Sequence, residues 1–202
     1  EGLILAGIGM LVIGNSRPAS GSEHHMSHFW EMKAMFEQRP QHFHGTKVGV
    51  ATGVMAKFYQ RFLTRNPADI DLTALKQNRK SEDEWKTQVR NSFGPVAEDA
   101  IAVGKPVFLN WEEQKKQVEK FQSSWLQIRA LQAIAPTFDQ LVEIQRTVGA
   151  SIMPEEIDVD LSLLRETLLH AKDVRTRYAV LRAADILGWL EEITDEVVNE
   201  YR

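Results

Sequence analysis

The sequence predicts an all-α protein. Apolar residues recur at helical spacing in several stretches, most clearly between residues 47 and 63. Breaks such as Asn66-Pro67 and Gly94-Pro95 separate these stretches, as helix ends require. No stretch alternates polar and apolar residues convincingly, and no hairpin turn is present. We therefore expect one helical domain over residues 1–202.

The first predicted helix covers residues 1–14 and is apolar on nearly every face, which is typical of a central helix surrounded by others. Its apolar run, residues 3–13, is about 11 residues long, whereas a membrane span needs about 20. The run also lacks the basic region and cleavage site of a signal peptide. We expect a buried helix, and a chain that begins inside a longer protein.

Two longer helices follow. The first is predicted from about Gly21 to Glu37, because Ser20 is a candidate N-cap with Glu23 three residues later, the spacing of a capping box. Arg39-Pro40 ends this helix. The second runs from Lys47 to Leu63, and His44 stands where that helical stretch begins.

Shorter helices account for the rest of the chain. Ser81 precedes three acidic residues and is a candidate N-cap. Residues 112–120 carry many charges, which most simply form a solvated helix face. The predicted elements are a short helix within 68–80, then 82–93, a segment between 94 and 106, then 111–135, 138–148, 161–172, 178–187 and 191–201.

The composition excludes several classes of protein. Hydrophobic residues make up 43% and charged residues 26%, as in an ordinary soluble domain. A net charge of −4 without a Lys/Arg stripe argues against nucleic-acid binding. Because there is no cysteine, any metal must be held by His and oxygen ligands, and a cytoplasmic location fits. No Gly-x-Gly-x-x-Gly, Walker or Gly-x-Ser-x-Gly motif is present, so no complete dinucleotide or hydrolase site is expected.

Histidines are concentrated in one segment: five of the six lie between His24 and His44. On a helix starting near Ser20, His24 and His28 are one turn apart on the same face. His25 lies about 100° away around that helix. With His44 at the start of the next helix, the pattern indicates a metal site built from two helices. Alternatively, these histidines cap helix ends or lie on an aromatic surface.

The remaining histidines are less informative. His25 is the nearest competitor of His24 as a ligand, through an i, i+3 pairing with His28. His42 is interpreted as an outer-shell or exposed residue, and His170, alone on a late helix, as a surface or core residue.

The motif Ser20-Gly-Ser-Glu-His-x-x-x-His28, followed by His44-Gly-x-Lys-Val48, resembles the metal-binding half of sn-glycerol-1-phosphate dehydrogenases. These belong to the superfamily of glycerol dehydrogenase, iron-type alcohol dehydrogenases and dehydroquinate synthase. The resemblance continues through three further segments, 136–139, 161–175 and 178–189. It implies the all-helical C-terminal domain of an NAD(P)-dependent oxidoreductase of phospholipid metabolism, whose N-terminal dinucleotide-binding domain has no counterpart here.

The resemblance also implies residue roles. His24 and His44 would be metal ligands, and His28 would contact the substrate as the catalytic residue. A third ligand, an aspartate, would precede Glu1. Arg17 and Lys47 would meet the phosphate of a small phosphorylated triol or ketone; the alternative for both is helix-end solvation.

The implied reaction converts dihydroxyacetone phosphate to glycerol-1-phosphate. Its metal would be zinc first, with nickel or iron as alternatives, and NAD or NADP would be bound mainly by the absent domain. This stretch alone is then expected to be inactive, without membrane insertion, and compatible with a homo-oligomer. The alternatives are glycerol dehydrogenase, dehydroquinate synthase, or a non-catalytic helical domain with a structural metal site. The last would need four ligands, and the sequence offers two good ones and a third candidate.

Overall fold

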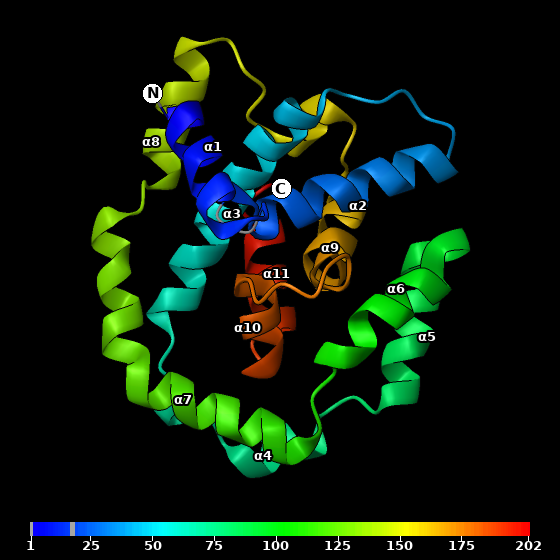
Figure 1. The fold of residues 1–202 in the computed structure, drawn as a ribbon, viewed down its shortest axis with the longest axis vertical. Helices are drawn as coiled ribbons and strands as arrows, with labels where there is room; N and C mark the ends of the chain where they lie inside the picture. The colour runs from blue at the N-terminus through cyan, green and yellow to red at the C-terminus, as the bar shows by residue number, and fades with distance from the viewer. Residues whose placement is uncertain (1, 17–18) are drawn as a thin grey trace.

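A computed structural model gives the fold of residues 2–16 and 19–202, and no strand occurs in those ranges (Figure 1). The α-helices are connected by short loops and 3-10 turns. They are α1 (Gly2–Ile13), α2 (Ser22–Phe36), α3 (His44–Thr64), α4 (Leu72–Gln77), α5 (Glu82–Phe93), α6 (Ala97–Gly104), α7 (Trp111–Ala130), α8 (Phe138–Thr147), α9 (Leu161–His170), α10 (Val180–Ile186) and α11 (Leu190–Asn199). The predicted all-α class is confirmed.

The core forms where α2 and α3 pack against each other and against the C-terminal helices. Helix α3 contacts α2, α8 and α11, while α9 contacts both α2 and α11 (Figure 1). The largest fully buried side chains come from these helices and from the end of α5; among them are Phe29, Phe58, Phe93, Met26, Leu164 and Leu168. This apolar contact orients α2, so that its opposite face is left for polar residues.

Two polar contacts attach α2 to α9. The buried indole N–H of Trp30 donates to Thr167 Oγ1 at 2.8 Å, and Lys33 Nζ lies 2.6 Å from Glu166 Oε1. Because the indole N–H is buried, its hydrogen bond fixes one relative position of the two helices.

The start of α5 follows its predicted capping signal. The predicted N-cap Ser81 accepts a hydrogen bond from Glu84 N at 3.2 Å, and Glu84 Oε2 accepts one from Ser81 N at 2.7 Å. This reciprocal pair is the capping box that starts α5.

The long helix predicted over 111–135 is α-helical only to Ala130 and ends as a 3-10 turn over Leu131–Ile134.

The predicted burial of the first helix is wrong. Helix α1 forms, but Leu11 is 82% and Val12 78% exposed. A helix that is apolar on every face needs neighbours on every side, but α1 makes no extensive contact with any of the described helices, and α8, α9 and α11 pack on α2 and α3 instead. No described helix is both long enough and apolar enough to cross a membrane.

The predicted N-cap of α2 is also displaced by one residue. Gly21, not Ser20, is the N-cap, and it makes no side-chain capping bond. The Glu23 carboxylate instead folds back and accepts a hydrogen bond from Gly21 N at 2.7 Å. A Cβ at Gly21 would lie 2.5 Å from Glu23 Oε2, so the glycine leaves room for this carboxylate.

Candidate metal centre

The histidines of α2 lie beside the first residue of α3. His24, His28 and Glu31 recur at i, i+4 and i+7, so they form one stripe along α2 on the side away from its buried residues. His44 begins α3, and its ring centroid is 5.5 Å from that of His24 and 5.2 Å from that of His28. The contact between α2 and α3 thus brings together three imidazoles from two parts of the sequence.

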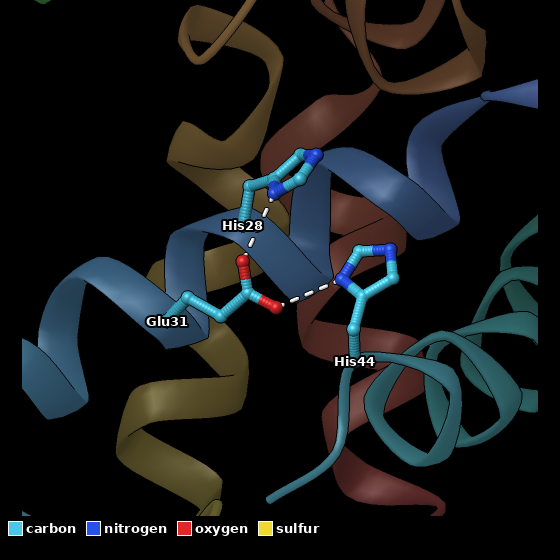
Figure 2. Close-up of side chains that lie close together, drawn as sticks. All are labelled: His28, Glu31 and His44. Carbon is cyan, nitrogen blue, oxygen red and sulfur yellow. Dashed lines mark hydrogen bonds and ion pairs between the residues drawn. The ribbon is translucent and has the colours of Figure 1, made fainter. Parts of the chain in front are cut away.

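Glu31 joins two of these histidines, as Figure 2 shows. His28 Nδ1 lies 3.0 Å from Glu31 Oε2, and His44 Nδ1 lies 2.8 Å from Glu31 Oε1. One donor atom from each of the three residues falls within 4.8 Å of the other two, close enough to hold a metal ion. Ser27 Oγ adds a contact of 3.2 Å to His44 Nδ1.

The charge of Glu31 is compensated by Lys47, whose Nζ lies 3.1 Å from Glu31 Oε1. The Lys47 side chain is buried, and its ammonium also donates to Gln41 Oε1 at 3.1 Å. Burial raises the pKa of Glu31, but hydrogen bonds from His44, His28 and Lys47 outweigh that effect and hold the pKa at about 2. Glu31 is therefore a carboxylate at any physiological pH.

His24 has a carboxylate partner of its own. Its Nδ1 lies 2.8 Å from Glu23 Oε1, the same oxygen that accepts the Gly21 N–H. Burial raises the pKa of Glu23. The hydrogen bonds from His24 and Gly21 lower that pKa by a larger amount, so the net shift is downward.

The side chains of the centre are accessible. The side chains of His24, His28 and His44 are 25%, 34% and 47% exposed. Solvent can therefore reach all three imidazoles.

The other histidines lie outside this centre. His25 is 1% exposed, and neither of its ring nitrogens has a hydrogen-bond partner in the described structure. Burial, assisted by the positive charge of Arg177, lowers the pKa of His25 to about 4. His42 pairs with Asp158, with 2.8 Å between Nε2 and Oδ2. Burial likewise lowers the pKa of His170 to about 4.

The phosphate-contact predictions fare differently. Arg17 lies outside the described residues. Lys47 lies next to the centre, but its ammonium faces Glu31 and Gln41.

Sequence reasoning missed Glu31 altogether. Its spacing of i, i+3 from His28 was a readable signal, since residues three apart meet on a helix.

Comparison with known proteins gives a consistent set of relatives. A glycerol-1-phosphate dehydrogenase (NAD(P)+) of Geobacillus stearothermophilus is 30% identical over 192 residues. A protein of the same name from Bacillus subtilis is 34% identical over 116 residues, which are 52% of this chain and 28% of the relative. Another, from Halalkalibacterium halodurans, is 48% identical over 60 residues, 30% of this chain and 15% of the relative. No family model and no solved structure matches the chain.

The coverage of these matches is unequal. The first match covers 95% of this chain but only 39% of the Geobacillus stearothermophilus protein. The chain therefore spans well under half of that relative's length.

Proposed function

We propose that this chain, which is related to glycerol-1-phosphate dehydrogenases over 95% of its length, is the metal-binding and substrate-positioning part of such an enzyme. One observation carries the proposal: His24 and His28 on α2 meet His44 at the start of α3. The reaction assigned is the NAD(P)-dependent interconversion of dihydroxyacetone phosphate and glycerol-1-phosphate, in the cytoplasm.

The donor set fits a divalent transition metal. Imidazole nitrogens suit zinc, nickel and iron, and no thiolate is available. We assign His24 and His44 as the ligands, with zinc as the first candidate. When bound, the ion would act as a Lewis acid on a substrate oxygen. Two protein ligands leave room for that oxygen, which favours a catalytic over a closed structural site.

His28 is assigned to the substrate. Its Nδ1 is bonded to Glu31, and its Nε2 has no hydrogen-bond partner in the described part of the chain. That Nε2 can hold a substrate hydroxyl by a hydrogen bond, or take and return its proton. Glu31 keeps the imidazole oriented for this purpose while the proton moves.

The substrate phosphate needs a positive partner. Lys47 already compensates the negative charge of Glu31, so we assign its ammonium to holding that carboxylate and not to the phosphate. Arg17 remains the proposed phosphate contact. No residue of the described structure is assigned to the dinucleotide.

A chimera tests the activity. This chain would replace the aligned segment of the Geobacillus stearothermophilus relative, and NADH or NADPH oxidation would be followed with dihydroxyacetone phosphate. We expect turnover, and a loss of about 10²–10⁴-fold in the His28→Ala chimera. His42→Ala is the matched control, since His42 is paired with Asp158 away from the centre. A folded, metal-loaded chimera whose rate is insensitive to His28→Ala would contradict the proposal.

A further inference from the structure

The three histidines of the centre share one feature: each uses Nδ1, and never Nε2, to contact a carboxylate. The distances are 2.8 Å from His24 to Glu23, 3.0 Å from His28 to Glu31, and 2.8 Å from His44 to Glu31. A carboxylate only accepts hydrogen bonds, so each contact requires the proton on Nδ1. The Nε2 atom of each neutral ring then carries the lone pair.

We propose that Glu23 and Glu31 are positioning residues that fix His24, His28 and His44 in the Nδ1–H tautomer and so leave three Nε2 lone pairs for ligands. The identity of those ligands, a divalent cation and a substrate oxygen, rests on the proposed function. The assignment of the tautomers does not rest on the proposed function, because it follows from the hydrogen bonds alone.

Glu31 can orient two rings because its two oxygens accept separately, Oε2 from His28 and Oε1 from His44. Its own position is fixed by Lys47, whose buried ammonium lies 3.1 Å from Oε1. Ser27 contributes from α2, with its hydroxyl 3.4 Å from the same oxygen. The carboxylate is therefore held from both helices.

Direct metal ligation by Glu31 is the competing assignment, because one atom each from His28, Glu31 and His44 lies within 4.8 Å. In that arrangement the ion would have to displace two hydrogen bonds to histidines. It would also lie next to the Lys47 ammonium, and like charges repel at that distance. A carboxylate already neutralised by a lysine is better suited to accept imidazole protons than to bind a cation.

Glu23 acts on one ring only. Its Oε1 accepts both from His24 Nδ1 at 2.8 Å and from Gly21 N at 2.7 Å. Because a single oxygen accepts both bonds, the carbonyl oxygen of a glutamine could replace it. The two glutamates therefore differ in how they should respond to the same substitution.

Nitrogen-detected NMR of the metal-free chain, labelled on its histidine nitrogens, tests the proposal at mildly alkaline pH. We expect Nδ1–H in His24, His28 and His44. His42 is the internal control, because its Nε2 contacts Asp158 at 2.8 Å, which requires the opposite tautomer. Nε2–H in His28 or His44 of the unmodified chain would overturn the proposal without any variant.

The Glu31→Gln variant, measured by the same NMR experiment, provides a second test of the proposal. A glutamine amide has only one oxygen that accepts hydrogen bonds. We expect this oxygen to keep the bonds from Lys47 and His44, so that the NH₂ group faces His28 and donates to its Nδ1. His28 should then change to the Nε2–H tautomer while His44 does not. Glu23→Gln is the matched control and should leave His24 as Nδ1–H. If Glu31→Gln leaves both of its histidines as Nδ1–H, the positioning role is wrong.

Zinc loading separates this inference from the proposed function. We expect zinc on Nε2 of His24 and His44, read from their nitrogen shifts, and zinc on Nδ1 of His44 would overturn the proposal in favour of Glu31 as a ligand. If no zinc binds but the tautomers are as stated, the positioning role stands and the proposed metal site fails.

Discussion

The imidazole rings of His28 and His44 lie 5.2 Å apart between centroids, with their planes 30° from parallel. They belong to different helices, so neither helix alone can create this pair. The apolar packing of α2 on α3 creates it, and Glu31 bridges the two rings at 3.0 Å and 2.8 Å. The centre therefore depends on the core beneath it as much as on its own residues.

The Trp30–Thr167 hydrogen bond should matter for stability. Thr167→Val would leave the buried indole N–H without an acceptor, at a cost of about 1–3 kcal/mol in the free energy of unfolding. Urea denaturation measures this. Thr87→Val is the matched control, because the exposed Thr87 hydroxyl donates only to Asp83 O within α5. Equal losses in the two variants would show that the Trp30 contact contributes nothing.

Gly21→Ala should disturb the first turn of α2. The added Cβ would approach Glu23 Oε2 to 2.5 Å, so the carboxylate must move and its bond to His24 Nδ1 should weaken. We expect the His24 nitrogen resonances to shift. Those of His28 and His44, which depend on Glu31, should be unaffected. Gly45→Ala is the control, since nothing lies within 4 Å of a Cβ built there. Unchanged His24 resonances in Gly21→Ala would contradict the role given to Glu23.

His25 should make the fold sensitive to acid. Burial and Arg177 lower its pKa from 6.5 to about 4, so between these pH values the unfolded chain binds the proton and the folded chain does not. Stability is then lost as the pH falls from about 6.5 towards 4, by up to about 3 kcal/mol from this group.

Urea midpoints at several pH values compare the wild-type chain with His25→Leu. The variant should lose less stability on acidification, because the group that takes up the proton is absent. Parallel curves for wild type and His25→Leu would refute the assignment.

Much of the fold could be predicted from local signals. Helical spacing in residues 47–63 and the cap at Ser81 are properties of short segments, and both helices formed as expected. The exposure of α1 could not be predicted in this way, because burial depends on whether other helices cover it. An apolar sequence indicates only that such cover would be favourable.

The same distinction between local spacing and contacts across helices applies to the candidate metal centre. The i, i+4 spacing placed His24 and His28 together, and the start of the next helix placed His44 near them. The i, i+3 spacing could have linked Glu31 to His28, but its contacts with His44 and Lys47 arise only when α3 packs on α2. The bond between Glu23 and His24 depended on where α2 begins, and the helix starts one residue later than predicted.

Calorimetric titration of the chain with Zn²⁺ tests the central claim most directly, because it measures whether these histidines hold a divalent ion. We expect one ion per chain, and at least about tenfold weaker binding in His24→Ala and in His44→Ala. His28→Ala should weaken binding less, since His28 is assigned to the substrate, and His42→Ala should have no effect. A wild-type chain that binds no zinc, or that binds it equally well without His24 or His44, would contradict this account.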